Sequence, residues 1–288
     1  MKSIVKSHPW ETQMVVLSPD AARGARIFHC MHRQAGLYRS LLAEVQRFRG
    51  KIYLEDGAIS RHELTEDGRH VQAIDAESWH VLSMDREGRV CGCLRFLEES
   101  LASGFDDLWV RHSALGSVPL VAKRFRRAVE WQMARAKTEY LRFGEVGGWA
   151  VAGERRWTLE PLRILLATYG LLQLLGGCIG VATATLRHGS AEILRRVGLA
   201  PLVADGAALP PYYDSRYGCE MEVLQFDSRR PNSKYKEWIL ELASYLQTAP
   251  VICGDGGREK PAPVRPKPHE AARHLGAPRY QAAVASFG

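Results

Sequence analysis

The run from residue 143 to residue 186 constrains the fold more than any other part of the sequence. Residues 143–151 are apolar and read as a strand, with the pair Gly147 and Gly148 in its middle. After a polar turn, Thr158 suits a helix N-cap, and Pro161 suits the first turn of a helix that continues to about residue 175. Residues 178–186 form a second apolar strand. The order strand, helix, strand predicts an α/β fold.

Residues 164–186 carry no charge, so the length of this segment also raises the possibility of a membrane span. However, Gly176 and Gly177 divide the segment into two shorter pieces, and Gln173 and several threonines interrupt it. Strands are short and helices longer, so the division favours a helix followed by a buried strand. We expect no transmembrane segment.

The chain is long enough to bury one substantial core, with 288 residues of which 46% are hydrophobic and 25% charged. We expect an N-terminal extension over residues 1–20, one domain over residues 21–252, and a flexible basic tail over residues 253–288. The tail is rich in Pro, Gly and Ala, which is typical of segments without a packed core.

Hydrophobic periodicity predicts the remaining elements of the domain. The sequence around Asp85-Arg86-Glu87-Gly88 indicates a hairpin, and Gly50 is expected to end the first helix. Residues 51–75 are long and irregular, as functional loops often are. The expected helices cover residues 21–48, 117–139, 189–197 and 235–246, and the expected strands cover residues 79–84, 90–96 and 219–226.

The six cysteines show no CxxC pairing, and the short motif His29-Cys30-Met31-His32 has no second ligand cluster to complete a metal site. We therefore expect no metal. Unpaired thiols and the absence of an apolar leader at the N-terminus indicate a bacterial-type cytoplasmic protein.

The formal charge of +7 is concentrated in part at Lys123, Arg124, Arg126 and Arg127, on the expected helix 117–139. One interpretation is a docking surface for an acidic partner, such as a phosphopantetheine-bearing acyl carrier protein or a nucleotide cofactor. The other is an ordinary solvated helix face. Nucleic acid is not expected as a partner, because no recognition motif accompanies the basic cluster.

Glu145 and the glycine pair indicate the chemistry. Glycine within a strand marks a bulge or a close approach of a ligand to the backbone. A carboxylate beside exposed backbone N–H groups provides what acyl transfer to an amine requires, namely a base for the amine and donors for the thioester oxygen. The alternative role for Glu145 is an ordinary ion pair at the end of a strand.

Four segments together resemble the GNAT acyltransferases, and within them the acyl-homoserine-lactone synthases and long-chain N-acyl amino acid synthases. The segments are residues 75–82, an acidic lead-in to a strand; residues 88–95, a glycine followed by a strand ending in Leu-Arg; residues 145–151, similar to the family's Glu-x-Ser-Arg-aromatic-Ala-Val strand; and residues 191–199, a helix before a later strand. Their order spans about two-thirds of the chain. The resemblance implies a central mixed, mostly antiparallel sheet flanked by helices, with two splayed strands that bind a thioester.

The resemblance also implies roles for individual residues. Glu145 would act as base, with backbone groups of Gly147, Gly148 and Trp149 polarising the thioester carbonyl. The anionic arm of the donor, acyl-carrier-protein or coenzyme A, would contact the following segment, at Val151, Arg155, Arg156 and Thr158, where arginines meet a helix N-terminus. No permanently bound cofactor is expected.

Four further residues are candidates for substrate binding. Arg95 would bind an acceptor carboxylate or a phosphate, or else pair with Asp75 as a structural ion pair. Asp75 would order the loop over the acceptor, and Trp79 would line an acyl tunnel or pack in the core. Tyr212 would supply a hydroxyl group or pack as an aromatic residue after a turn.

The sequence departs from the family at three points. Gly147 and Gly148 stand where the lactone synthases have Ser-Arg, the glycine-rich pyrophosphate loop is not evident in residues 152–157, and the tyrosine that many GNAT enzymes use as general acid is missing. We expect transfer of a long acyl chain to the amine of an amino acid or similar small acceptor. The alternatives are a short-chain acetyl-CoA-dependent N-acetyltransferase, a non-catalytic module that binds acyl thioesters, and a membrane-associated protein whose basic helix lies on anionic lipid.

Overall fold

The structure, a computed structural model, describes residues 11–19, 27–100, 102–117, 119–187 and 189–254. The helices are α2 (Ala35–Glu55), α3 (Pro119–Thr138), α4 (Glu160–Leu174), α5 (Ser190–Val197) and α6 (Lys236–Thr248). The strands are β1 (Gln13–Ser18), β2 (Met31–Arg33), β3 (Trp79–Met84), β4 (Val90–Glu99), β5 (Arg142–Val151), β6 (Cys178–Thr185), β7 (Ala200–Pro201), β8 (Val203–Ala204), β9 (Ala207–Ala208), β10 (Tyr212–Asp214), β11 (Cys219–Asp227) and β12 (Val251–Cys253).

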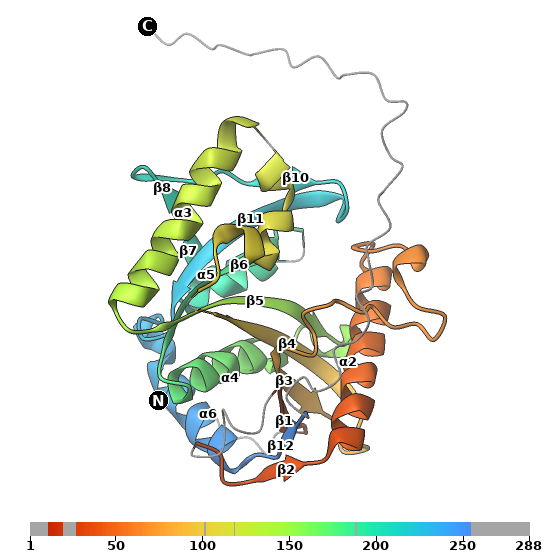
Figure 1. Cartoon of the computed structure of the whole chain (residues 1–288). Helices are drawn as coiled ribbons and strands as arrows, with labels where there is room; N and C mark the ends of the chain where they lie inside the picture. The colour runs from red at the N-terminus through yellow and green to blue at the C-terminus, as the bar shows by residue number, and fades with distance from the viewer. Residues whose placement is uncertain (1–10, 20–26, 101, 118, 188, 255–288) are drawn as a thin grey trace, which may run out of the picture. The chain divides into compact units, whose positions relative to one another are not determined.

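One large sheet organises the fold, with the strand order β10-β11-β6-β5-β4-β3-β1-β12-β2 and β7 beside β11 (Figure 1). Most neighbouring strands are antiparallel, whereas β5 and β6, β1 and β12, and β12 and β2 are parallel. The mixed, mostly antiparallel sheet expected from the sequence is therefore confirmed.

Helices cover both faces of this sheet, because side chains along a strand alternate between the faces. In β3, Val81 packs in the core beneath α4 and α6, whereas the next residue, Leu82, packs against α2. On the side of the sheet formed by β5, β6 and β11, helix α3 covers a second core that includes Phe143 and Val181. The two helices beneath β3 pack closely at Gly170 of α4, where an added Cβ atom would lie 2.9 Å from the backbone nitrogen of Ala243 in α6.

The uncharged run forms α4 and β6, as predicted. Gly176 and Gly177 separate them, and both have positive φ angles, which few residues other than glycine adopt. Among the helices of the described residues, none combines the length and apolarity needed to cross a bilayer.

Short 3₁₀ turns fill several of the connections between these elements. They are η1 (Arg61–Glu63), η2 (Phe105–Asp107), η3 (Trp109–His112), η4 (Ala114–Ser117), η5 (Gly153–Arg155) and η6 (Ser233–Tyr235). Three of them, η2, η3 and η4, follow one another between β4 and α3, and this connection becomes important for the site.

The predicted N-terminal extension over residues 1–20 is wrong for its described part. Residues 13–18 form β1, which pairs with β3 and with β12 and buries Met14, Val16 and Leu17. This strand is only six residues long and lies among polar neighbours, so its short alternation was hidden in the sequence. The predicted tail overlaps β12 by one residue, Cys253. Residues 255–288 lie outside the described residues.

The first helix also differs from its prediction over residues 21–48. Residues 31–33 form the edge strand β2, and α2 begins at Ala35 and continues past Gly50 to Glu55. Gly50 does not end the helix because it serves a packing function. A Cβ atom at this position would lie 2.7 Å from the carbonyl oxygen of Gly68 and 2.9 Å from Cδ2 of Leu64. The glycine thus lets the irregular segment 59–75 lie directly against α2.

Candidate functional site

The strands β5 and β6 separate in the middle of the sheet. They pair in parallel from Arg142 and Cys178 up to Val146 and Ala182. Beyond this point β5 continues beside β4 alone, and β6 continues beside β11 alone. A cavity of about 630 Å³ occupies the region of the separation and is lined by residues from both strands. The splayed strand pair expected from the sequence is present.

A β-bulge on β5 accompanies the separation. Cys93 lies opposite Ala150 and Arg95 lies opposite Gly147, so Leu94 alone faces both Gly148 and Trp149. Gly148 has φ of +62°, a left-handed conformation that favours glycine. A bulge bends its strand and increases its twist, which directs the second half of β5 away from β6. The interpretation of the glycine pair as a bulge is confirmed.

The bulge leaves the backbone of Val151 facing the cavity. Because the N–H group of Ala152 donates to the carbonyl oxygen of Cys91, the backbone groups of Ala152 point toward β4. Backbone groups alternate along an antiparallel strand, so those of Val151 point to the opposite edge, which β6 has left. The carbonyl oxygen of Val151 accepts a bond there from Nε of Arg156, at 3.3 Å. Val151 also lines the cavity.

Glu145 is buried at the closed end of the separation and lines the cavity. Its two carboxylate oxygens accept hydrogen bonds of 2.6 Å from the backbone N–H groups of Trp109 and Val110 in η3. Burial raises the pKa of Glu145, although the two N–H donors oppose the shift. The carboxylate therefore holds the connection between β4 and α3 against the cavity.

A second carboxyl group, that of Glu99 in β4, interacts with Glu145. Burial and the neighbouring Glu145 carboxylate raise the pKa of Glu99 to about 8. At neutral pH the two groups therefore share a proton that isolated carboxyl groups would have lost. The sequence alone gave no indication of this pair, since Glu99 and Glu145 meet only when β4 and β5 pair.

Arg95 lines the cavity but its Nη1 atom is committed to a buried network. This atom donates to Oε1 of Gln72 at 2.5 Å and to Oδ1 of Asp75 at 2.6 Å. Arg49 of α2 donates to both oxygens of the same aspartate, at 3.0 and 2.6 Å. Burial alone would raise the pKa of Asp75, but the two guanidinium groups outweigh it and hold that pKa well below its usual range.

The network shows where two predicted substrate-binding residues lie. Asp75 is buried behind Arg95 and does not line the cavity, so any effect on a substrate acts through the arginine. Trp79 is fully buried in the core beneath α4, away from the cavity, because its position on β3 directs it to that face. The structure thus brings Arg95, but not Asp75 or Trp79, to the cavity wall.

The expected donor-binding segment lies at the mouth of the cavity. Arg156 lines the cavity and forms a bidentate ion pair with Asp56, at 2.8 and 2.9 Å. Arg155 lies outside the lining and pairs with Glu11 at 3.6 Å. The Thr158 hydroxyl accepts from the backbone N–H of Glu160, the first residue of α4. Trp157, which the sequence did not single out, lines the mouth and is 96% exposed.

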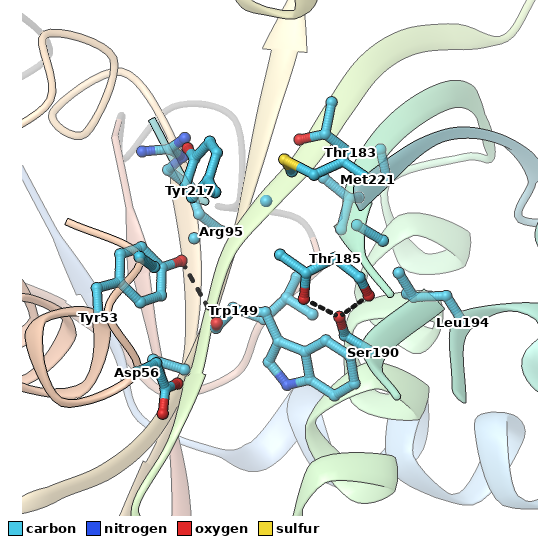
Figure 2. Close-up of a pocket in the computed structure, with 18 of the residues that line it drawn as sticks. Tyr53, Asp56, Arg95, Trp149, Thr183, Thr185, Ser190, Leu194, Tyr217 and Met221 are labelled. Atoms are coloured by element: carbon cyan, nitrogen blue, oxygen red, sulfur yellow. Dashed lines mark hydrogen bonds between the residues drawn. The ribbon is translucent and has the colours of Figure 1, made fainter. Parts of the chain in front are cut away.

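Figure 2 shows side chains on both sides of β5 within the cavity. Trp149 lies on the side of Thr185, Ser190 and Leu194, where Ser190 at the start of α5 bonds to the hydroxyl and carbonyl oxygens of Thr185. Tyr53 lies on the opposite side, and its hydroxyl donates to the carbonyl oxygen of Trp149 at 3.4 Å. The first side is largely apolar and the second carries most of the charged groups.

Tyr212 of β10 lines the cavity, as predicted for a substrate-binding residue, together with Ser113, which the sequence did not indicate. Two other lining residues form a pair beside them. Arg216 donates to both oxygens of the buried Asp214, at 3.0 and 2.7 Å. These residues come from separate turns with no shared motif, so no sequence signal would have grouped them.

The basic cluster on α3 is partly neutralised by ion pairs. Arg126 pairs with Asp106 at 2.5 Å, and both Arg127 and Arg124 pair with Asp205, at 2.8 and 3.7 Å. Lys123 is exposed. Acyl-carrier-protein docking at this helix stays a prediction. Over the residues that the structure describes, His, Cys, Asp and Glu form no group of three or more that could hold a metal ion.

Comparisons with known proteins complete the description. A scan against protein-family models finds no match, and a search of curated proteins finds none. Among solved structures, BjaI, a CoA-dependent acyl-homoserine lactone synthase determined with SAM and isopentyl-CoA, is 16% identical, with a TM-score of 0.49 over 86% of this chain and 96% of its own. LasI, an acyl-homoserine lactone synthase, is 17% identical, with a TM-score of 0.41 over 66% and 84%.

A third similar structure is FeeM, an N-acyl amino acid synthase from uncultured soil microbes. It is 10% identical, with a TM-score of 0.44 over 68% of this chain and 88% of its own. These solved structures come from the same two groups of acyl-transferring proteins that the four sequence segments resemble.

Proposed function

We propose that this chain is an N-acyltransferase that moves an acyl group from a pantetheine thioester to the amine of a small acceptor. The observation that carries the proposal is the separation of β5 and β6 beyond Val146 and Ala182. This separation leaves a cavity into which both a backbone donor, at Val151, and a buried carboxylate, Glu145, are directed. A hydrogen-bond donor and a base on one cavity wall are the two groups that acyl transfer to an amine uses.

In this mechanism the thioester lies between the separated strands, where its carbonyl oxygen accepts from the Val151 N–H group. The acceptor amine attacks the carbonyl carbon, a C–N bond forms and the C–S bond breaks. Glu145, directly or through water, takes the proton that the amine loses, and the thiolate leaves with the pantetheine arm. The buried carboxylate suits this task, because burial raises its pKa toward the operating pH.

Arg95 is the group best placed to select an acceptor that carries a carboxylate, such as an amino acid. Its Nη1 atom is engaged by Gln72 and Asp75, but its Nη2 atom lies only 3.9 Å from the Cβ position of Gly147, on the cavity wall. A guanidinium group held rigidly by a buried aspartate is preorganised to bind a carboxylate. Homoserine-lactone formation is less favoured, because Gly147-Gly148 replaces the Ser-Arg of those synthases.

The size of the cavity favours a long acyl chain over acetyl. A volume of about 630 Å³ is that of a site for a drug-sized ligand. The lining on the α5 side is apolar, with Leu194, Ile193 and Trp149. The donor is acyl-carrier-protein or acyl-coenzyme A, with Arg156 and the α4 N-terminus near its phosphate.

A non-catalytic module that binds acyl thioesters is the second candidate, and one observation favours it. Both oxygens of Glu145 already accept backbone N–H groups, from Trp109 and Val110, so the carboxylate also has a structural role. A base occupied in this way must release one of these bonds or use a remaining lone pair. A module that binds without turnover would not need to.

The experiment combines turnover and binding with the purified chain. Acyl-coenzyme A and acyl-carrier-protein donors of graded length are offered with the common amino acids, and thiol release and product mass are followed. Glu145→Gln should lower kcat/KM by about 10²- to 10⁴-fold, whereas Glu154→Gln, an exposed carboxylate in η5, should not. Wild-type activity should also rise with pH as Glu145 loses its proton.

The binding arm separates the two candidates. A non-hydrolysable 2-oxododecyl thioether of pantetheine is titrated by calorimetry. Binding without transfer from any donor would favour the non-catalytic module, and the absence of both would reject the proposal. Full activity in Glu145→Gln would remove Glu145 as the base while leaving acyl transfer intact.

A further inference from the structure

Two buried hydroxyl groups face the cavity without a fixed partner. The side chains of Ser113 and Tyr212 are 6% and 8% exposed, and both residues line the cavity. Neither hydroxyl oxygen makes a hydrogen bond of good geometry to any of the residues that the structure describes. Buried polar groups in folded proteins nearly always have partners, since leaving one unsatisfied costs about 1–3 kcal/mol.

The two residues are held rigidly from different elements. The backbone of Ser113 is fixed between η3 and η4, where its N–H donates to the carbonyl oxygen of Val110 and its own carbonyl accepts from Gly116. Tyr212 lies in β10, in register with Met221 of β11. Because Ala114 N–H also donates to Asp214 of β10, at 3.4 Å, the two elements are tied together. Neither hydroxyl can find a partner through a large backbone movement.

The surroundings of this hydroxyl pair are electrically neutral. Asp214 and Arg216 neutralise each other through two hydrogen bonds. Burial and the nearby guanidinium groups of Arg111 and Arg216 lower the pKa of His112, so the ring is uncharged at neutral pH. Burial and the Asp214 carboxylate raise the pKa of Tyr212, which keeps its hydroxyl protonated and able to donate.

This neutrality decides the kind of ligand. A carboxylate here would be buried beside two uncharged hydroxyl groups with no unpaired cation, which is costly. A neutral oxygen, such as a ketone, an amide carbonyl or a hydroxyl group, accepts from the same donors without that cost. The carboxylate of an acceptor has a better site at Arg95.

We propose that Ser113 and Tyr212 form a subsite that recognises a neutral oxygen atom of the substrate, additional to the thioester carbonyl. The inference rests on the proposed acyl transfer and adds a specificity element to it. The oxygen could belong to the acceptor side chain or to the acyl chain, and the chemistry of recognition is the same in both cases.

The test compares matched substrates that differ by one oxygen. In the acceptor arm, serine is compared with alanine and tyrosine with phenylalanine. In the donor arm, acyl thioesters of equal length are compared with and without a ketone or hydroxyl group at the third carbon. The wild type should favour the oxygen-bearing member by about tenfold or more in kcat/KM in one of the two arms, which identifies the source of the oxygen.

The preference should fall toward unity in both Tyr212→Phe and Ser113→Ala, because each removes one donor with little change in shape. Tyr213→Phe and Ser117→Ala are the matched controls, since the Tyr213 side chain is 63% exposed, Ser117 is also exposed, and neither lines the cavity. Both controls should keep the wild-type preference. Equal turnover of all pairs by the wild type, or a preference that survives in both variants, would overturn the inference.

Binding measurements keep this inference separate from the proposed function. Calorimetry of the acceptor pairs, and of pantetheine thioethers with and without the additional oxygen, reports the same preference without any turnover. If binding discriminates and the two variants lose the discrimination, the subsite stands even where no acyl transfer is found. If transfer occurs without any discrimination, the subsite is wrong and the proposed function stands.

Discussion

Val146 of β5 and Ala182 of β6 are the last two residues that pair before these parallel strands separate. Two residues further along β5, Gly148 forms the bulge opposite Leu94. The position of the cavity thus depends on where a parallel ladder stops, and that point is set by local backbone conformation at one glycine. The donor at Val151 and the carboxylate of Glu145 lie on either side of it.

The bulge predicts different outcomes for the two glycines. In Gly148→Ala, the left-handed conformation costs about 1–2 kcal/mol for a residue with a Cβ atom. That atom would also lie 3.3 Å from Nη1 of Arg49 and from Cβ of Arg95. In Gly147→Ala, the only neighbour within 4 Å is Nη2 of Arg95, at 3.9 Å. Thermal unfolding should show a lower melting temperature for the first variant and little change for the second.

If the two alanine variants were equally stable, the left-handed conformation at Gly148 would not be a requirement of the folded state. The argument that the bulge fixes the separation of the strands would then lose its support.

The buried network around Asp75 predicts a large loss of stability in Asp75→Asn. The substitution removes the counter-charge of Arg49 and Arg95 while both guanidinium groups stay buried. Breaking a buried pair in this way costs about 3–5 kcal/mol. Urea denaturation should therefore show a much lower midpoint. Asp67→Asn is the control, since Asp67 pairs with Arg47 and Arg69 at the surface and solvent screens those pairs.

A midpoint for Asp75→Asn close to that of Asp67→Asn would contradict this account. It would mean that water reaches the two arginines, and that Arg95 is not held in the rigid position that the proposed acceptor site requires.

Glu99 predicts a dependence of stability on pH. Its pKa is raised from the model value of 4.5 to about 8 in the folded protein, so between these values the folded state keeps a proton that the unfolded state has lost. The free energy of unfolding therefore falls as pH rises from about 5 to about 8. Glu99→Gln removes this contribution, and its melting temperature should fall less over the same interval, by about 2–4 °C per 1 kcal/mol.

Glu154→Gln serves as the control for Glu99, because Glu154 is exposed in η5. Parallel pH profiles for Glu99→Gln and the wild type would show that Glu99 loses its proton normally and does not share one with Glu145.

Most of the fold could be predicted from the sequence. The hairpin β3–β4, helices α3, α4, α5 and α6, and strands β5, β6 and β11 lie within a few residues of their predicted bounds. These elements have strong periodicity and clear turn residues. The short strands β1, β2 and β12 were missed because three to six residues give too little pattern, and they become strands only by pairing with one another and with β3.

The site could be predicted in part. Glu145, the glycine pair and Val151 are contiguous in sequence, so one strand pattern indicated all of them. Ser113, Glu99 and Tyr53 reach the cavity from three separate segments, and no sequence spacing connects them. The placement of Trp79 depended on which face of β3 is directed to the core, and an apolar strand buried on both faces does not reveal that.

The most direct test of the central claim is hydrogen–deuterium exchange with and without the 2-oxododecyl thioether of pantetheine. A thioester analogue between the separated strands should slow exchange at residues 147–157 and 182–190, and Val151 N–H should gain protection as it becomes a hydrogen-bond donor to the ligand. Exchange in α6, on the far side of α4, should not change. Protection confined to α3, or located elsewhere in the chain with none at residues 147–157, would contradict the binding of a thioester between β5 and β6.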